Sequence, residues 1–294
     1  MRVAVSGASG LLGRALTAAL RRRGDEVVVL GRRSADLAWD PNLGPPPGPA
    51  VEGLDAFVHL AGEPVAARRW SAEQKRRIRD SRVLGTRHAV EGLRAAGRAR
   101  PATFICASAI GYYGDRGDEL LDERSAPGDD FLASVCVDWE AEARRAEELG
   151  VRVVNLRTGV VLARQGGALP LLARPFRFFV GGPLGDGRHW VAWIHLDDEV
   201  GLMLHALDST AVRGPINLVA PSPVRNRVFA HALGRVLARP ALFPAPRLAL
   251  SLVLGQRVEV VLASQRARPS VAEATGYRFR FAELETALRD LFDR

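Results

Sequence analysis

Short apolar runs alternate with amphipathic stretches along the first two thirds of this chain. The runs are rich in β-branched residues and predict buried parallel strands over 2–5, 26–30, 56–60, 104–108, 151–157 and 215–219. Apolar residues that recur every three or four positions predict helices over about 11–23, 71–96 and 130–149, and one that ends near 207. Strands and helices in alternation predict an α/β fold with a doubly wound parallel sheet.

The pattern loosens from about Arg164, where glycine- and proline-rich loops surround short helical stretches. We therefore expect a dinucleotide-binding Rossmann domain over 1–163, completed by about 190–220. Segments 164–189 and 221–294 would form a smaller, mostly helical C-terminal substrate lobe. Residues 34–55 are polar and proline-rich, and would wrap the edge of the nucleotide domain.

The run from Ser6 to Gly13 lies between the first strand and the first helix, and three glycines recur in it. Gly7 would allow a tight turn, Gly10 would let backbone amides approach a pyrophosphate, and Gly13 would let helix and strand pack closely. The pyrophosphate would then lie at the positive end of the helix dipole. A glycine turn that binds nothing is the alternative. The predicted contacts in this turn are Gly7, Ser9, Gly10, Leu11, Leu12 and Gly13.

The end of the second strand indicates which cofactor is preferred. NAD sites usually place an acidic residue there to accept hydrogen bonds from ribose. Here Gly31 is followed by Arg32 and Arg33, and no carboxylate occurs before Asp36. Two guanidiniums could pair with the 2′-phosphate of NADP(H), which we therefore expect as cofactor. Two solvated loop arginines are the alternative.

The carboxyl ends of the third and fourth strands would face the same crevice. The third strand ends in Leu60, Ala61 and Gly62, where the missing side chain of Gly62 would let the chain pass close to adenosine. The fourth strand places Ala107 at that edge. Ser71 would cap the following helix, with Gln74 completing a capping box.

Composition limits the partners and the compartment. The chain has 294 residues, of which 47% are hydrophobic and 25% charged, and no apolar run is long enough to span a membrane. It shows no signal-peptide pattern and only two cysteines, Cys106 and Cys136, without metal-ligand or disulfide spacing. We expect a cytoplasmic protein with no metal and no membrane partner.

The formal net charge is +8, carried almost entirely by arginine, with Lys75 the only lysine. The basic cluster over 75–82 follows helical spacing without interleaved aromatic residues, and no nucleic-acid-binding module is recognisable. Anionic small molecules are the better match to this charge.

With these motifs in view, the chain resembles the extended (atypical) short-chain dehydrogenase/reductases, and more closely the uncharacterised epimerase family described as nucleoside-diphosphate-sugar epimerases. The resemblance covers nearly the whole chain. It rests on the glycine turn and on the segments 59–64, 69–70, 81–82, 108–114, 139–140, 156–162, 193–198, 262–266 and 276–279. It implies an NAD(P)-dependent oxidoreductase or epimerase, and it makes Arg82 a further cofactor contact unless that residue lies on a solvated helix face.

The parent mechanism uses a tyrosine whose pKa is lowered by a lysine four residues later. No Tyr-x-x-x-Lys pair occurs in this chain. Aligning Trp139 and Glu140 with the superfamily helix puts Leu132 and Cys136 where that pair would stand. The serine of the fourth strand also shifts, because Ala109 falls at its usual place.

Other residues must therefore supply any acid/base chemistry. We name Ser108, Tyr112 and Tyr113 as catalytic candidates, although the tyrosines could serve only to pack a tight glycine loop. Cys136 is better interpreted as a buried structural thiol. Candidate walls of a substrate pocket are Arg157, Arg188, Trp193 and His195, and His195 could equally have a structural hydrogen-bonding role.

Two functions remain open at this point. One is an NADP-dependent oxidoreductase or epimerase that acts on a nucleotide-sugar-like or other carbonyl substrate. The other is a catalytically inactive, NADPH-binding regulatory or scaffold protein, for example one linked to cell division. The expected partner is a small-molecule ligand. The expected assembly is a monomer, or a homodimer through the helix after Ser71.

Overall fold

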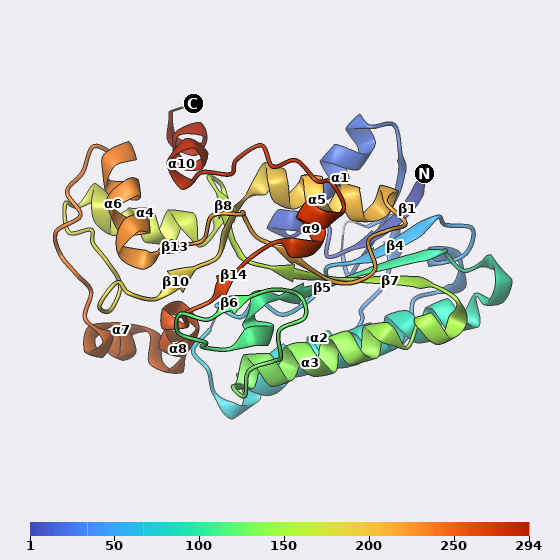
Figure 1. Cartoon of the computed structure of the whole chain (residues 1–294). Helices are drawn as coiled ribbons and strands as arrows, with labels where there is room; N and C mark the ends of the chain where they lie inside the picture. Colours follow the sequence, from blue (N-terminus) through green and yellow to red (C-terminus); the bar gives the residue numbers. More distant parts are fainter. Residues whose placement is uncertain (34, 67, 294) are drawn as a thin grey trace.

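Seven strands form one parallel sheet at the centre of the molecule, in the order β12-β7-β5-β4-β1-β2-β3 (Figure 1). The computed structural model describes residues 1–33, 35–66 and 68–293. The strands are β1 (Arg2–Ser6), β2 (Glu26–Gly31), β3 (Leu37–Ala38), β4 (Ala56–His59), β5 (Thr103–Ala109), β7 (Arg152–Thr158) and β12 (Gly214–Leu218). The six strands predicted from the apolar runs are all present, which confirms the doubly wound fold. The short edge strand β3 was not predicted, because it lies in the polar connection and pairs with β2 through only two residues.

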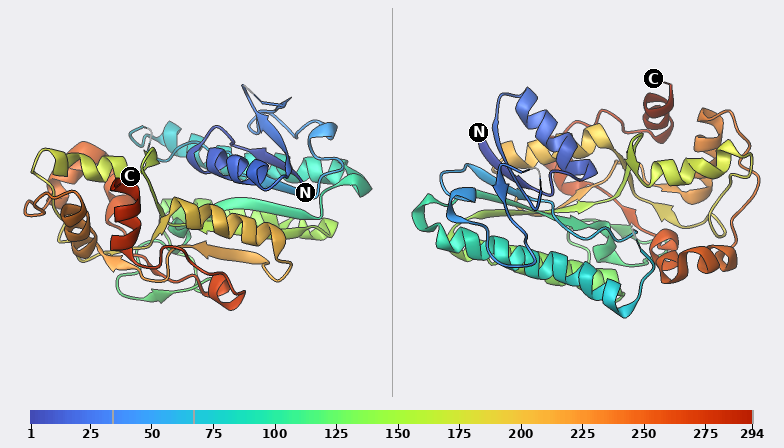
Figure 2. Two further views of the ribbon diagram at one scale, coloured as in Figure 1. Left: turned by 90° about the horizontal axis from the view of Figure 1, so that it is seen from above. Right: turned by 180° about the vertical axis from the view of Figure 1, so that it is seen from behind.

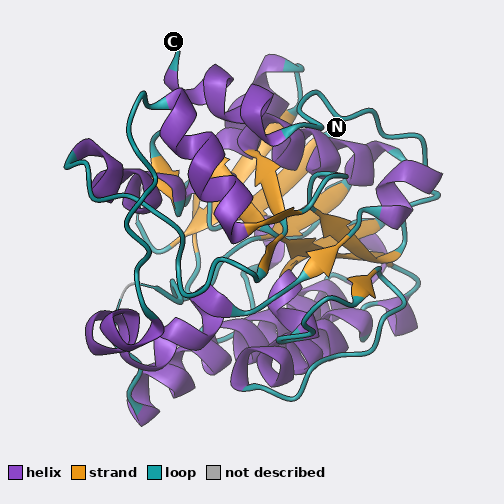
Figure 3. Cartoon of the chain, turned by 60° about the vertical axis from the view of Figure 1, so that its left-hand side comes forward, coloured by secondary structure: helices purple, strands orange, loops and turns teal. Residues whose placement is uncertain are grey.

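Helices cover both faces of this sheet, as Figures 1 and 3 show. On one face, α1 (Leu11–Arg22), α5 (Leu196–Asp208) and α9 (Ser270–Ala274) pack around a core that includes Leu16, Ile105 and Met203. On the other face, α2 (Ala72–Ala95) and α3 (Phe131–Arg144) pack around Phe57 and Phe104. Because both faces are covered, the strands are buried on both sides, which explains their continuous apolar runs.

Local sequence signals set the helix ends well. The Ser71 hydroxyl accepts a 3.1 Å hydrogen bond from the Gln74 amide, so α2 begins where the capping residue predicts. The reciprocal half of the capping box is absent, because the Gln74 side chain instead donates to Glu63 Oε1 at 3.2 Å. The helix expected over 130–149 ends at Arg144, and a separate 3₁₀ turn follows over Glu147–Leu149.

A second core lies beside the sheet and unites segments that are distant in sequence. It is formed by α4 (Leu169–Arg177), α6 (Asn226–Val236) and α10 (Leu284–Phe292), which pack around Trp193 and Leu288. The left panel of Figure 2 shows this part of the chain at one end of the molecule. The remaining short strands are β6 (Leu120–Leu121), β8 (Val160–Ala163), β9 (Gly166–Gly167), β10 (Trp190–Val191), β11 (Trp193–His195), β13 (Val224–Arg225) and β14 (Arg266–Ala267). Helices α7 (Arg247–Leu254) and α8 (Val258–Leu262) follow this core, whereas α9 returns to the central sheet.

Candidate functional site

The glycine turn after β1 is packed too closely to accept side chains. Gly7 has a φ of +73°, and a Cβ there would lie 2.7 Å from the carbonyl carbon of Leu60. A Cβ on Gly13 would lie 2.3 Å from the Gly7 carbonyl oxygen. The turn closes through a 3.0 Å hydrogen bond from the Gly10 amide to that same oxygen. These approaches bring α1, β1 and the chain after β4 together at one point, as the glycine spacing predicts.

The N-terminus of α1 opens from this turn without a side-chain cap. Gly10 occupies the capping position, and the first turn of the helix carries no acidic residue. Amides at a helix N-terminus carry the positive end of its dipole and favour an anion. The end of α1 is therefore suited to a pyrophosphate, and the turn has room for one because Ser9 and Gly10 are exposed.

A cavity of about 1320 Å³ extends from this helix end along the carboxyl ends of β1, β2 and β4. It is large enough for a dinucleotide. Among the predicted cofactor contacts, its lining includes Gly7, Ser9, Gly10, Gly31, Arg32, Arg33, Leu60, Ala61 and Gly62. Leu11, Leu12, Gly13, Arg82 and Ala107 are not part of that lining. Contact of any of these residues with a cofactor stays a prediction.

Sequence reasoning missed several residues of this cavity. Arg14 and Arg21 enter it from α1, and Trp39, Pro41 and Asn42 enter it from the connection after β3. Helical spacing could have found the two arginines, because positions 14 and 21 lie seven residues apart and share one helix face. The sequence of the connection after β3 shows no periodic pattern that would have identified Trp39, Pro41 or Asn42.

The end of β2 places charged groups of both signs at the cavity. Arg32 and Arg33 are exposed and line it, and so does Asp36. Asp36, the first carboxylate after the strand, turns back and accepts a 2.8 Å hydrogen bond from the Val29 amide through Oδ2. One carboxylate oxygen is thus occupied by the strand's own backbone, while both guanidiniums face solvent.

Ser81 and Arg82 of α2 hold the loop after β4 in place through hydrogen bonds to its backbone. Ser81 Oγ accepts a 3.0 Å hydrogen bond from the Glu63 amide, and Arg82 Nη1 donates to the Glu63 carbonyl at 2.9 Å. The Arg82 guanidinium also lies 5.1 Å from the centre of the Trp139 ring. Burial lowers the pKa of Arg82. The pair holds the loop that carries Gly62 into the cavity.

The candidate catalytic serine lies in a buried polar network under the loop after β5. Ser108 Oγ donates a 2.7 Å hydrogen bond to Glu140 Oε1. Arg157 forms a two-bond ion pair with Glu140, at 2.8 and 2.9 Å, and only 3% of either side chain is exposed. Ser108 is therefore directed toward α3 and the Arg157–Glu140 pair.

The two candidate tyrosines differ in their surroundings. The Tyr113 hydroxyl donates to Asn217 Oδ1 at 2.7 Å and accepts from Arg157 Nη1 at 3.0 Å. Burial raises the pKa of Tyr113 to about 12, which is opposite to the shift that a general base at neutral pH needs. Tyr112 is only partly buried, and its ring centre lies 3.5 Å from the Arg157 guanidinium carbon. In the described ranges, no side chain or backbone group forms a hydrogen bond with the Tyr112 hydroxyl.

Cys136, at the position where a relative would carry lysine, is a buried thiol. Burial raises its pKa to about 12, and Cys106 shows the same shift for the same reason. Leu132, at the tyrosine position, packs beside Gly111, where a Cβ would lie 3.6 Å from the Leu132 Cβ. Neither position offers an acid or base at neutral pH.

The four candidate pocket residues are not gathered around the nucleotide cavity. Arg157 is buried as described, and Arg188 is exposed on the loop before β10. Trp193 has no exposed surface, and its indole donates to the Ser222 carbonyl at 3.0 Å. His195 caps α5, because its Nδ1 accepts a 3.1 Å hydrogen bond from the Asp197 amide. Their contact with a substrate stays a prediction.

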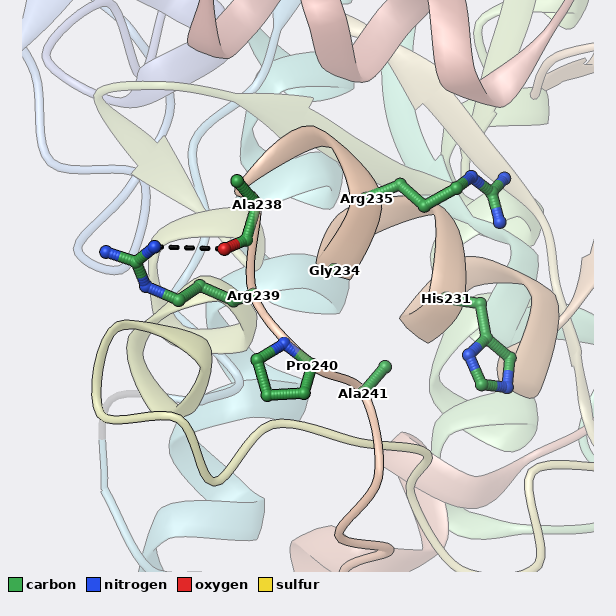
Figure 4. A pocket seen from close by; sticks show the side chains of 7 residues that line it. All are labelled: His231, Gly234, Arg235, Ala238, Arg239, Pro240 and Ala241. Carbon is green, nitrogen blue, oxygen red and sulfur yellow. Dashed lines mark hydrogen bonds between the residues drawn. The ribbon is translucent and has the colours of Figure 1, made fainter.

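A second hollow of about 460 Å³ lies at the end of α6 (Figure 4). Its polar side chains do not converge: Arg235 extends away and forms a 2.7 Å ion pair with Glu285, and Arg239 points to the opposite side. Across 1–33, 35–66 and 68–293, no group of three His, Cys, Asp or Glu side chains is placed to hold a metal ion. Over the same residues, no helix has the length and apolar character needed to cross a bilayer.

Comparison with known sequences gives two family matches. Residues 3–218 match the NAD dependent epimerase/dehydratase family, and residues 245–291 match a domain of unknown function (DUF1731). The chain is 42% identical over 292 residues to Epimerase family protein Mb2239 of Mycobacterium bovis, an alignment that covers 97% of this chain and 96% of that protein. It is 39% identical to the chloroplastic Epimerase family protein SDR39U1 homolog of Arabidopsis thaliana, covering 98% of this chain and 86% of the relative.

A solved structure gives the corresponding match in three dimensions. Human epimerase family protein SDR39U1 (isoform 2), crystallised with NADPH, superposes with a TM-score of 0.90 at 34% sequence identity. The superposition covers 100% of this chain and 99% of the human one. Because one relative is named as chloroplastic, the cytoplasmic location of this chain stays a prediction.

Proposed function

The chain belongs to the NAD dependent epimerase/dehydratase family, and from that premise we propose that it binds NADP(H) in the cavity beside the glycine turn. The observation that carries the choice of cofactor is the arrangement after β2. Two exposed guanidiniums, on Arg32 and Arg33, line the cavity where the adenosine ribose of a dinucleotide would lie. The human relative crystallised with NADPH supports the same choice.

The position of Asp36 strengthens this argument. A carboxylate free at the end of β2 would repel a 2′-phosphate and accept hydrogen bonds from the ribose of NAD. Asp36 also lines the cavity, but its Oδ2 is held by the Val29 amide of the strand, and the two neighbouring guanidiniums outnumber this one carboxylate. Arg14 and Arg21 add positive charge to the same cavity. A phosphorylated ribose therefore meets guanidiniums there, which pair with phosphate through charge-assisted hydrogen bonds.

For activity, the proposal is an oxidoreductase or epimerase acting on a nucleotide-sugar-like or other carbonyl substrate, with non-standard catalytic residues. Bound NADP(H) would supply the hydride transfer. Of the three candidates, Tyr112 is the best placed to exchange a proton with a ligand, since its hydroxyl is unoccupied in the described part of the chain. Ser108 and Tyr113 would position the loop after β5 through Glu140 and Arg157.

A binding titration tests the cofactor. We expect NADPH to bind the wild-type protein more tightly than NADH. The double variant Arg32→Ala/Arg33→Ala should lose about 1.5–3 kcal/mol of NADPH affinity, roughly 10- to 150-fold, and keep its NADH affinity. The matched control is Arg98→Ala/Arg144→Ala, because both of these arginines are exposed and lie outside the cavity. Equal losses for NADPH and NADH would mean that the arginines do not read the 2′-phosphate, and failure of the wild type to bind either would end the proposal.

Turnover is tested separately, with cofactor binding established first. Nucleotide sugars and simple carbonyl compounds are added to the NADPH-loaded protein, and substrate-dependent NADPH oxidation or sugar epimerisation is followed. Tyr112→Phe should abolish turnover and leave NADPH affinity unchanged. A protein that binds NADPH but turns over none of these substrates would instead match the regulatory hypothesis.

A further inference from the structure

Helix α7 is apolar and yet contributes no buried residue to the fold. Leu248, Leu252 and Val253 are 75%, 73% and 71% exposed. A surface helix of a soluble protein normally turns its apolar residues toward the core and its polar residues toward water. Helix α7 instead leaves these apolar residues in water.

The segment that leads into α7 and a loop beside that segment carry further exposed apolar residues. After α4, Phe178, Phe179 and Val180 are 68%, 54% and 55% exposed, and after α6, Leu242 and Phe243 are 71% and 55% exposed. The two loops run side by side because the Phe243 amide donates to the Gly181 carbonyl at 3.1 Å and the Ala245 amide donates to the Pro183 carbonyl at 2.8 Å. We call the exposed residues of these loops and of α7 the apolar rim. Its members are Phe178, Phe179, Val180, Leu242, Phe243, Leu248, Leu252 and Val253.

Helices α4, α6 and α7, which adjoin or carry the rim residues, lie at the left end of the molecule in Figure 1, on the side away from the N-terminus. Single exposed apolar residues are ordinary, but eight of them on adjoining segments mark a candidate interaction surface. The nucleotide cavity is formed by the opposite part of the chain, mainly residues 6–42 and 60–64. Cofactor binding therefore does not explain why the rim residues are exposed.

The charge around the rim is mainly positive, with the exposed carboxylates of Asp186 and Glu259 at the borders of its segments. Residues 149–185 and 209–258 contain no aspartate or glutamate, and the second range contains seven arginines. Arg174, Arg177, Arg239 and Arg247 are exposed, and the Arg239 guanidinium carbon lies 4.5 Å from the centre of the Phe179 ring. Within the described residues, none of these four forms an ion pair with a carboxylate. The rim combines exposed aromatic and aliphatic side chains with unneutralised guanidiniums.

We propose that the apolar rim docks this protein on the surface of an anionic phospholipid bilayer. The aromatic and aliphatic side chains would enter the boundary between headgroups and acyl chains, and the arginines would pair with lipid phosphates. This attachment needs no membrane-spanning helix, so it is compatible with the lack of one among the described residues. The expectation of no membrane partner came from the absence of a span, and it does not address surface attachment.

Charge also argues against a second copy of the chain as the occupant. Two rims facing each other would bring Arg177, Arg239 and Arg247 of both copies together, without carboxylates from 209–258 to neutralise them. An anionic bilayer complements the same arginines. The occupant is therefore expected to be negatively charged and apolar beneath its charged surface.

Vesicle cosedimentation with the full chain tests the proposal. We expect binding to phosphatidylcholine vesicles that contain about 30% phosphatidylglycerol, little binding to pure phosphatidylcholine, and partial release by high salt. Two double variants, Leu248→Ser/Leu252→Ser and Arg177→Glu/Arg247→Glu, should each weaken binding by about tenfold or more. All four positions are exposed, so the variants should fold normally.

Matched controls are available elsewhere on the surface. Leu43→Ser removes an apolar side chain that is 85% exposed, and Arg98→Glu/Arg144→Glu reverses two exposed arginines outside the rim. Both controls should bind vesicles like the wild type. The proposal is overturned if the wild type does not bind anionic vesicles, if the controls lose as much binding as the rim variants, or if the Leu248→Ser/Leu252→Ser variant converts a dimer to a monomer without changing vesicle binding.

Discussion

The Ser108 hydroxyl and the Glu140 carboxylate form a 2.7 Å hydrogen bond beneath the loop that follows β5. The same carboxylate oxygen accepts a 2.8 Å bond from Arg157 Nε, so α3, β5 and β7 meet at one group. All three side chains are buried. The serine by which a short-chain reductase would polarise a substrate carbonyl falls at Ala109 in this chain. Ser108 stands one residue before that position, and here it anchors the loop.

This network predicts unequal costs for its members. Replacing Glu140 by Gln leaves the buried Arg157 guanidinium without a counter-charge, and we expect a loss of about 3–5 kcal/mol in the free energy of unfolding. Ser108→Ala removes one hydrogen bond and should cost about 1–2 kcal/mol. Denaturant unfolding measures both.

The exposed ion pair of Arg79 with Asp138 provides the control for this comparison. Its side chains are 48% and 42% exposed, so Asp138→Asn should change stability by less than about 1 kcal/mol. A Glu140→Gln variant no less stable than Ser108→Ala would contradict the assigned role of the buried pair.

The glycine turn makes a second prediction. A Cβ at position 13 would meet the Gly7 carbonyl oxygen at 2.3 Å and the Ala8 Cα at 2.6 Å, and both atoms belong to the backbone of the turn itself. Gly13→Ala should therefore shift the turn, reduce NADPH affinity by at least about tenfold and lower stability by a few kcal/mol, despite alanine's better helix propensity. Isothermal titration and thermal unfolding measure these effects. Gly44→Ala is the matched control, because a Cβ there meets nothing within 4 Å, and both quantities should stay unchanged.

Local signals explain how much of this fold could be predicted. The β1–α1–β2 unit follows from an apolar run, a helical repeat and the glycines between them, all within about thirty residues. The partners of Ser108 and Arg157 could not be predicted in that way. Glu140 lies 32 residues after the serine and 17 before the arginine, and only the packing of α3 against the sheet brings them together. For His195 the sequence allowed either a pocket wall or a structural hydrogen bond, and the structure shows the hydrogen bond, because the ring accepts the Asp197 amide at the start of α5.

The exposure of α7 was also beyond sequence reasoning. Its apolar residues, taken alone, predict a helix that packs on a core. Whether α7 finds a core to pack on depends on the path of the chain before and after the helix. Residues 247–254 alone do not determine that path.

The thiols give a third prediction. Burial raises the pKa of Cys106 and of Cys136 to about 12, so little thiolate exists at pH 8. In the native protein, neither thiol should react with a disulfide reagent on the timescale of minutes, and both should react once denaturant is added. Absorbance of the released thiolate counts the reactive groups. Rapid modification of one thiol in the native state, lost in Cys136→Ser, would instead make Cys136 accessible and reopen a catalytic role for it.

Glu199 gives the last prediction, on the dependence of stability on pH. Its side chain is fully buried, and burial raises its pKa from 4.5 to about 8, although the Thr158 hydroxyl donates a 2.8 Å hydrogen bond to Oε1. Because the folded protein binds this proton more tightly than the unfolded chain, Glu199 contributes stability that is complete below pH 4.5 and is lost as the pH rises toward 8. His59 acts in the opposite direction, since burial lowers its pKa to about 4 and its contribution to stability is lost as the pH falls below 6.5.

Comparing the wild type with Glu199→Gln cancels the contribution of His59, because both proteins contain this histidine. The variant should gain on the wild type by about 1.4 kcal/mol per pH unit across that window and by nothing further above it, as measured by urea unfolding at intervals from pH 5 to pH 9. A difference that does not vary with pH would show that Glu199 is ionised in the folded protein.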